Sequence, residues 1–430
     1  MSMLLLSSFV ILVLLGVPIA FVLGTASFIS LWFGSTQALT IIPQQMFTAC
    51  DSFPLLAIPL FMIAGSLMGE GGISRRLINL ADACVGHYTG GLAYVGIITC
   101  MIFAAISGSG PATVASVGGI MIPAMIAAGY DRGFSCAVMA IAGSIGVIIP
   151  PSIPMVTYGV SADTSIGSLF TAGFGPGILI GLALILCSRI MCTRGGYGMP
   201  THGPKTMKER FQAFKDAFFA LLMPIIILGG IYGGIFTPTE AAAVAVFYGL
   251  IVGVFVYKEL PVSKIPKVLS DSGVTTAMIM LIIAAAKVFG WIMTSERIPD
   301  AMAHAILSVS ESKYVILLMI NILLLFVGCF METNAALIIF TPIFLPVAKA
   351  LGMSSVHFGI IMIVNLAIGM VTPPLGVNLF VACGVDKGMT IDRISKSVIP
   401  LIIANVIALM LVTYVEPVSM TLVRFFGQSV

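Results

Sequence analysis

Apolar positions fill this chain in long runs, and two neighbouring runs are interrupted near their middle by polar or helix-breaking residues. Residues 88–130 contain no Asp, Glu, Lys or Arg and are broken by Ser107-Gly108-Ser109-Gly110-Pro111. Residues 133–162 are also free of charge and are broken at Pro150-Pro151-Ser152-Ile153-Pro154. Lipid offers no hydrogen bonds, so backbone groups freed at such breaks need protein, water or an ion as partners. The pattern predicts a re-entrant hairpin over 88–130 and an unwound helix over 133–162.

The same pair of interruptions recurs in the second half of the chain. A shift of 223 positions carries Pro150-Pro151 onto Pro373-Pro374, Gly146 onto Gly369 and Ser109 onto Glu332. This shift predicts a second hairpin over 314–348 and a second broken helix over 350–385. Paired broken apolar segments in corresponding halves are typical of the binding site of a secondary transporter. Two structural helices that are merely kinked are the alternative.

Composition defines the class of protein. Of the 430 residues, 59% are hydrophobic and 9% are charged, and the mean hydropathy is +1.14. These values predict an all-α polytopic membrane protein. The net charge of +3 is small and dispersed, which excludes a nucleic-acid footprint. The eight cysteines lack the spacing of a metal or disulfide framework, so we expect small core residues.

Charge along the chain divides it into six parts. Lys and Arg exceed Asp and Glu in the long polar segment 189–216, which predicts a cytoplasmic amphipathic linker between the two repeats. The predicted parts are N-terminal scaffold helices 1–87, a first transport core 88–188, the linker 189–216, second scaffold helices 217–313, a second transport core 314–397 and a C-terminal helix 398–430.

Three charged residues near apolar runs need an interpretation. Asp51 is expected to cap the helix that follows it. Thr237-Pro238-Thr239-Glu240 has the residues of a capping box, so Glu240 is expected to cap a helix rather than to take part in transport. Lys287 lies deep in an apolar run, where an ionisable group is either functional or reaches the interface with its long side chain.

Four motifs in order carry a resemblance to a known family. They are Ile106-Ser107-Gly108-Ser109-Gly110-Pro111-Ala112-Thr113, Ile149-Pro150-Pro151-Ser152-Ile153-Pro154, Phe236-Thr237-Pro238-Thr239-Glu240-Ala241-Ala242-Ala243 and Thr372-Pro373-Pro374-Leu375-Gly376. The chain as a whole resembles the large membrane subunit, DctM-like, of tripartite ATP-independent periplasmic (TRAP) transporters, with the sialic-acid branch as the nearest resemblance.

That resemblance implies a carrier of the bacterial inner membrane with two inverted repeats that moves its transport domain like an elevator. It further implies coupling to Na⁺ ions without an organic cofactor and an organic acid as substrate, with sialic acid as the leading specific candidate. The partners implied are a small four-helix membrane subunit (DctQ-like), a periplasmic substrate-binding protein (DctP-like) and membrane lipid.

Sodium prefers hard oxygen ligands, which a broken helix supplies as free carbonyls together with Ser, Thr or Asn side chains. We therefore predict two sodium sites, each shared by a hairpin tip and the broken helix of the same repeat. The first comprises Ser107, Ser109 and Gly110 with carbonyls near Gly146 and Ile149. The second comprises Gly328, Thr333 and Asn334 with Gly369 and Thr372.

Half-helix N-termini after each break are expected to point positive dipole ends at one cavity, where a carboxylate is stabilised. Ser107, Ser152 and Asn378 are the predicted contacts of that substrate. Glu332 would repel an acid unless sodium or a proton neutralises it, and suits a sugar hydroxyl or an amide better.

Two other functions remain open at this point. Gly108-Ser109-Gly110 suggests an intramembrane serine hydrolase, which needs a base near the nucleophile. The four histidines, His87, His202, His304 and His357, all lie at or near segment ends, which leaves Lys287 as the candidate base. The stronger competitor is a self-sufficient sodium-coupled anion carrier that needs no binding protein.

Overall fold

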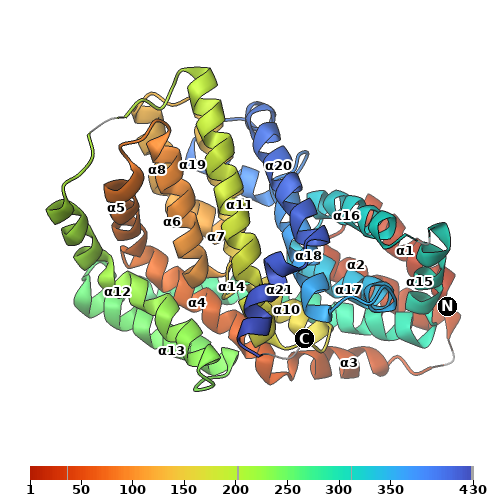
Figure 1. The fold of residues 1–430 in the computed structure, drawn as a ribbon. Coiled ribbons are helices and arrows are strands. Elements are labelled where there is room, and N and C mark those ends of the chain that lie inside the picture. Colours follow the sequence, from red (N-terminus) through yellow and green to blue (C-terminus); the bar gives the residue numbers. More distant parts are fainter. Residues whose placement is uncertain (36, 201–202, 311, 428–430) are drawn as a thin grey trace.

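The computed structural model describes the whole chain except residues 36, 201–202, 311 and 428–430, so His202 lies outside the described residues. Every regular element in the described part is a helix, which confirms the all-α class (Figure 1). In the same part, 9 helices are long and apolar enough to cross a membrane. They are Phe53–Glu70, Gly110–Ala127, Ile166–Gly195, Met207–Tyr232, Pro238–Val256, Val262–Ser295, Lys313–Phe330, Thr333–Ala350 and Ile391–Tyr414.

The chain begins with helices that pack outside the two hairpins. These are α1 (Ser2–Leu14), α2 (Ile19–Gly34), α3 (Ile41–Cys50), the short η1 (Phe53–Leu56), α4 (Ala57–Glu70) and α5 (Ile73–Val85). Helix α5 is amphipathic, with Arg75 exposed and Leu77 buried. It connects α4 to the first hairpin.

The first hairpin enters and leaves the molecule on one side. It consists of α6 (Gly91–Ser107), α7 (Gly110–Thr113), the π-helical turn η2 (Val114–Gly118) and α8 (Gly119–Ala127). The backbone N–H of Leu92, at its start, donates to the hydroxyl of Tyr130, beyond its end, at 3.2 Å. Gly108 makes the turn at the tip with φ of 61°, where a side chain would meet the carbonyl of Pro151.

The broken helix follows directly. It consists of α9 (Arg132–Ser144), the 3₁₀ turn η3 (Ile145–Val147) and α10 (Ile153–Ser161), and α11 (Ile166–Gly195) comes next. Asp131 caps α9 by accepting a hydrogen bond from Phe134 N at 2.8 Å. The gap before α10 contains the two consecutive prolines, neither of which can donate a backbone hydrogen bond.

The second half repeats this order of elements. Its helices are α12 (Met207–Tyr232), α13 (Pro238–Ile251), η4 (Val252–Val256), η5 (Val262–Lys264), α14 (Ile265–Ser295), α15 (Ile298–Val309), α16 (Lys313–Phe330), α17 (Thr333–Ala350), α18 (Ser355–Gly369), α19 (Val377–Val385), α20 (Ile391–Tyr414) and α21 (Pro417–Phe425). Helix α9 begins at residue 132 and α18 at residue 355, which agrees with the shift of 223 seen in the sequence.

The two repeats have opposite orientations. Helices α11 and α20 lie side by side and run antiparallel (Figure 1): the thiol of Cys187 donates to Pro400 O at 3.5 Å near one end, and Gly175 packs against the carbonyl of Val418 at the other. The first hairpin opens beside the segment that follows α11, because Gly90 N donates to Gly198 O at 2.7 Å. The second opens at the end of α20, where the hydroxyl of Tyr414 donates to Tyr314 O at 2.9 Å. The hairpins therefore open to opposite faces of the protein.

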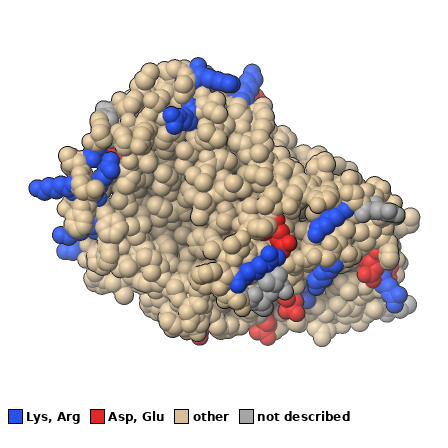
Figure 2. Space-filling model, viewed as in Figure 1, with Lys and Arg blue, Asp and Glu red and all other residues tan. Residues whose placement is uncertain are grey.

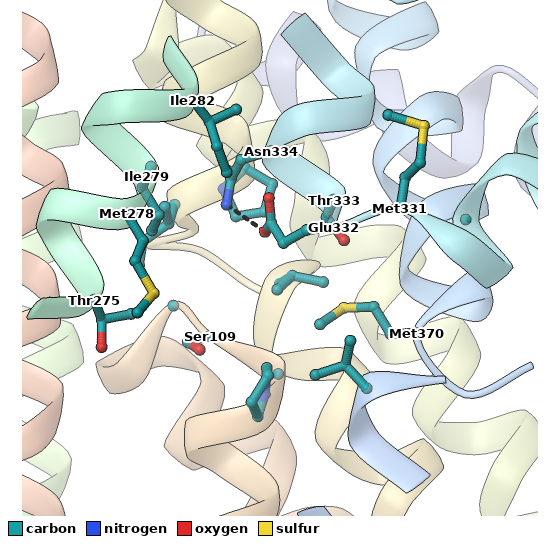
Figure 3. A pocket seen from close by; sticks show the side chains of 18 of the residues that line it. Ser109, Thr275, Met278, Ile279, Ile282, Met331, Glu332, Thr333, Asn334 and Met370 are labelled. Atoms are coloured by element: carbon teal, nitrogen blue, oxygen red, sulfur yellow. Dashed lines mark hydrogen bonds between the residues drawn. The ribbon is translucent and has the colours of Figure 1, made fainter. Parts of the chain in front are cut away.

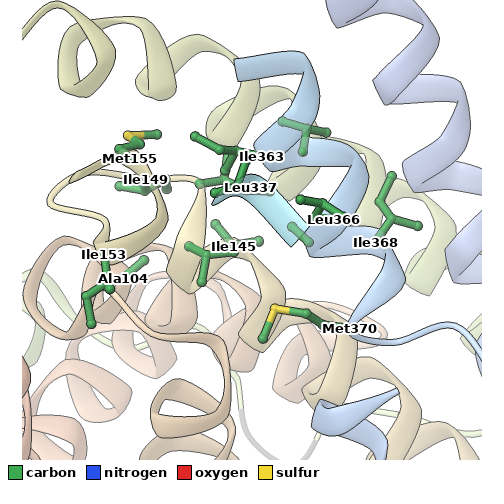
Figure 4. Close-up of a cluster of buried hydrophobic side chains, with 14 of the residues drawn as sticks. Ala104, Ile145, Ile149, Ile153, Met155, Leu337, Ile363, Leu366, Ile368 and Met370 are labelled. Atoms are coloured by element: carbon green, nitrogen blue, oxygen red, sulfur yellow. The ribbon is translucent and has the colours of Figure 1, made fainter. Parts of the chain in front are cut away.

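A buried apolar cluster joins the repeats (Figure 4). Ile145 and Ile149 from the first broken helix face Leu337 of the second hairpin and Ile363 and Leu366 of α18. All five side chains are at most 5% exposed. Between helices inside a bilayer, such side chains stabilise the contact mainly through close van der Waals packing.

The capping predictions have opposite outcomes. The capping box is confirmed: Glu240 N donates to Thr237 Oγ1 at 3.3 Å, and Thr237 N donates to Glu240 Oε2 at 2.8 Å. The prediction for Asp51 is wrong, since Asp51 ends α3 and its side chain makes no capping hydrogen bond in the described part. Pro54 explains why Asp51 does not cap the next helix, because proline has no backbone N–H and so removes one of the donors that a capping side chain would bind.

On the face shown in Figure 2, charged side chains lie at the left and upper edges and in a group at the lower right, and a broad uncharged surface lies between them. Lys287 is exposed on the outer surface of α14. The side chain is accordingly placed toward the surroundings of the protein and not toward its centre.

Candidate functional site

Both hairpin tips reach one cavity of about 430 Å³ (Figure 3). Residues 108–111 of the first tip and residues 328–334 of the second line it, together with residues next to both helix breaks. Helix α14 closes one wall with Met278, Ile279 and Ile282. The two hairpin tips, which lie more than two hundred positions apart in the sequence, therefore meet at one cavity, as the internal repeat predicts.

Four helix N-termini face this cavity. Gly110, Ile153, Thr333 and Val377 are the first residues of α7, α10, α17 and α19, and each of them lines it. Helix N-termini present unpaired N–H groups and the positive end of the helix dipole. The cavity is thus suited to an anion.

An oxygen cluster lies at the first tip. The hydroxyl of Thr113 donates to Ser109 O at 2.8 Å, and Ser107 Oγ lies 2.8 Å from Thr113 Oγ1. Gly146 packs against this cluster so closely that a Cβ there would lie 2.7 Å from Ser109 O. The structure thus brings Ser107, Ser109 and Gly146 together. These oxygens are of the hard type that sodium prefers.

Two other residues predicted for the first sodium site are placed differently. Gly110 lies beside the amide of Asn378, with the site of its Cβ 3.2 Å from Asn378 Nδ2. Ile149 turns its side chain toward Gly177 of α11, so the contribution of its carbonyl stays a prediction.

The second tip meets its own broken helix through backbone. A Cβ on Gly369 would lie 2.5 Å from Gly328 Cα, so the two chains touch at these glycines. Thr333 Oγ1 is buried and has no hydrogen-bond partner in the described part, which is costly unless a ligand supplies one. The hydroxyl of Thr372 donates to Ile368 O at 2.8 Å. Thr333 is therefore the strongest ligand candidate here.

A chain of polar contacts joins the second tip to the first repeat. Asn334 Nδ2 donates to Glu332 Oε1 at 2.7 Å, and the hydroxyl of Thr157 in α10 donates to Asn334 Oδ1 at 2.9 Å. Ala335 N donates to Glu332 Oε2 at 3.0 Å, so the same carboxylate caps α17. Glu332 therefore positions the tip while it lines the cavity (Figure 3).

The substrate contact predicted for Ser152 needs correction. Its hydroxyl is fully buried, donates to Val147 O at 2.6 Å and accepts from Met155 N at 3.4 Å, and the residue does not line the cavity. A serine after a helix break is favoured as an N-cap, and that is its role here. Asn378 is also fully buried; its Nδ2 donates to Ala140 O at 3.2 Å, while its Oδ1 has no partner among the described residues.

Sequence reasoning missed three contributors to the site. Thr113 was part of a recognised motif, and its position four residues after Ser109 on a helix was a usable signal. Thr157 carried no signal, because its partner Asn334 is 177 positions away. The wall formed by Met278 follows from packing alone.

The fold and the cavity define a class: a secondary transporter built from two inverted repeats, each with a re-entrant hairpin and a broken helix. Two solved transporters share the fold. YdaH of Alcanivorax borkumensis has a TM-score of 0.60 at 14% identity and matches 95% of this chain and 97% of its own. MtrF of Neisseria gonorrhoeae has a TM-score of 0.61 at 13% identity and matches 95% and 94%.

The family follows from the sequence. Residues 6–418 match the model of the tripartite ATP-independent periplasmic transporter, DctM component, and the chain belongs to this family. It is a large permease subunit of a TRAP transporter and a multi-pass membrane protein. As in other TRAP permeases, its location is the bacterial inner membrane.

Curated relatives differ in the substrate that their names give. The chain is 50% identical to the isethionate TRAP transporter permease protein DctMQ of Oleidesulfovibrio alaskensis, over 96% of this chain and 65% of that protein, so it spans about two thirds of the relative's length. It is 43% identical to the C4-dicarboxylate TRAP transporter large permease of Pseudomonas aeruginosa, over 95% of both chains. It is 39% identical to the sialic acid TRAP transporter large permease SiaM of Vibrio cholerae, over 96% of both.

Proposed function

We propose that this permease imports a small organic anion in symport with Na⁺. The observation that carries the proposal is the shared cavity. Four helix N-termini meet there with Ser109 of the oxygen cluster at the first tip and with the hydroxyl of Thr333 at the second, which has no hydrogen-bond partner among the described residues. Dipole ends favour the anion, and uncharged oxygens favour an alkali cation over a transition metal. In the described residues, no group of three or more His, Cys, Asp or Glu could hold a transition metal.

The substrate class is narrowed by Glu332, the only charged side chain among the described residues that line the cavity. A carboxylate repels a second anionic group but accepts a hydrogen bond from a hydroxyl. Isethionate pairs one sulfonate with one hydroxyl and sialic acid pairs one carboxylate with several hydroxyls, whereas a C4-dicarboxylate carries two anionic ends. We therefore infer a hydroxylated monoanion, with sialic acid and isethionate as the two specific candidates.

The movement we propose is of the elevator type. The apolar side chains Met62 and Met278, from α4 and α14, face the two tips across the cavity. Among the described residues, these two side chains make no hydrogen bond to the tips, so no such bond must break when one part slides past the other. The two hairpins and broken helices would move as one body against these helices.

The partners we propose are a small four-helix membrane subunit and a periplasmic substrate-binding protein, as the word tripartite in the family's description suggests. The test is uptake of a panel of organic acids in proteoliposomes with and without the two partners. Uptake that needs both supports the tripartite carrier. Uptake by this chain alone would favour the self-sufficient carrier instead.

The hydrolase alternative lacks support in the cavity. Ser109 lines it, but no histidine or lysine does so among the described residues. His357 is buried with its Nε2 2.9 Å from Val412 O, and Lys287 is exposed outside the cavity. A serine nucleophile without a base within reach is inactive.

Thr113→Val tests the first sodium site. This change keeps the shape of the side chain and removes the hydroxyl that bonds Ser109 O and Ser107 Oγ. We expect the Na⁺ concentration for half-maximal uptake to rise about tenfold, which corresponds to about 1.4 kcal/mol. Thr193→Val, which removes a comparable hydroxyl bond to Arg189 O at the exposed end of α11, is the control. An unchanged sodium dependence in Thr113→Val would remove Thr113 from the site.

A further inference from the structure

A second cavity, of about 410 Å³, lies between α5, the start of α12 and the segment after η4. Arg75, Arg76 and Lys215 line it together with the acids Asp216 and Glu259. It shares no lining residue with the central cavity. Its chemistry is therefore independent of the transport site.

One of the three cations is already used by the protein. Arg76 Nη1 donates to Glu259 Oε1 at 2.7 Å, and its guanidinium carbon lies 3.7 Å from the centre of the Tyr257 ring. Asp216 Oδ1 accepts from Gln212 Nε2 at 2.8 Å. Arg75 and Lys215 are exposed, and neither has an ion pair in the described part of the chain. The three cations and two acids give the lining a net charge of +1, with Arg75 and Lys215 facing the single remaining carboxylate, that of Asp216.

The surroundings of this cavity are those of a membrane surface. Phe211, Phe214 and Phe218, on the first turns of α12, are 68%, 45% and 42% exposed. Lys and Arg side chains gather on the edge of the molecule where α5 and α12 lie (Figures 1 and 2). A helix that exposes Phe side chains beside Lys and Arg is typical of the membrane interface, and excess Lys and Arg mark the cytoplasmic leaflet.

We propose that this cavity binds the phosphate of an anionic phospholipid. Arg75 and Lys215 pair with the phosphate, and the apolar side chains of Phe219 and Val256 in the same lining contact the start of the acyl chains. The exposed apolar neighbours favour a lipid over a soluble phosphate, which has no apolar part to bury. The bound lipid joins α5 to α12 and so fixes the helix that connects α4 to the first hairpin.

The test is native mass spectrometry of the detergent-purified chain titrated with phosphatidylglycerol. The double variant Arg75→Gln/Lys215→Gln is expected to bind it roughly tenfold more weakly, since each lost cation weakens attraction to an anionic lipid. Both side chains are exposed and have no ion pair among the described residues, so we expect folding to be preserved, and an unchanged thermal transition without added lipid verifies this. The single variant Arg75→Gln is expected to show a smaller loss in the same direction.

Arg194→Gln/Lys208→Gln is the matched control, because it removes one exposed Arg and one exposed Lys outside the cavity. It is expected to bind phosphatidylglycerol like the unmodified chain. If both double variants lost phosphatidylglycerol binding equally, the loss would come from the lower net charge and not from this cavity, and the proposal would be overturned. Equal binding of phosphatidylcholine, or displacement of the lipid by inorganic phosphate at the same concentration, would also overturn it.

Discussion

Gly369→Ala is expected to lower uptake at least about tenfold while the chain still folds. The added Cβ would lie 2.5 Å from Gly328 Cα and from its carbonyl carbon. Real Cβ atoms do not approach backbone so closely, and backbone cannot turn aside as a flexible side chain can. The second tip must therefore move away from its broken helix. Initial uptake rates in proteoliposomes, measured against Na⁺ concentration, report the loss.

Gly119→Ala is the matched control for this prediction. Gly119 also lies on a hairpin helix, and a Cβ there meets nothing within 4 Å. Alanine is the better helix former, so this variant should transport normally and be slightly more stable. Normal uptake by Gly369→Ala would show that the contact between the second tip and its broken helix is not needed for transport.

Glu332→Ala is expected to have a comparable effect through hydrogen bonds instead of sterics. It removes the carboxylate that accepts hydrogen bonds from Ala335 N and Asn334 Nδ2. The side chain of Asn334, which accepts a hydrogen bond from Thr157, is then no longer held in position. Loss of a cap and of a charged hydrogen bond together costs about 2 kcal/mol, or roughly 30-fold in substrate affinity if the tip's bound conformation depends on it. The measurement is the substrate concentration for half-maximal uptake.

Two further variants separate the roles of Glu332. Thr157→Val cuts only the far end of the polar chain and should produce a smaller loss in the same direction. Glu70→Ala removes a carboxylate paired with Lys264 on the surface and should leave uptake unchanged. If Glu332→Ala took up substrate with unchanged affinity, Glu332 would be neither a positioning residue nor a substrate contact.

The hairpins and breaks could be predicted from sequence because the membrane restricts where free backbone can lie. A charge-free run that is interrupted at Ser107 to Pro111 can form few structures in a membrane other than a re-entrant hairpin. The shift that places Glu332 over Ser109 then locates the second hairpin. The meeting of the two tips follows from the same repeat. Family membership was predicted from four motifs in order and is confirmed by the match over residues 6–418.

The side-chain roles could be predicted less well. Ser152 has the residue type and the position of a ligand, yet its hydroxyl caps the half-helix that it begins. Thr157 contacts Asn334 only because the two repeats pack against each other, and this contact cannot be predicted from the local sequence. Asp51 had the residue type of a cap but precedes a turn whose proline leaves fewer donors to satisfy. Local chemistry predicted where the site lies, and tertiary packing decided which groups face it.

The central claim is that oxygens at the two broken repeats couple a cation to an organic anion. Its most direct test is uptake of isethionate and of sialic acid by the assembled transporter in proteoliposomes, with an inward gradient of Na⁺, of K⁺ or of protons. We predict accumulation of one of these acids with the Na⁺ gradient and none with K⁺ or protons. Equal accumulation without Na⁺, or accumulation driven by protons alone, would contradict the account.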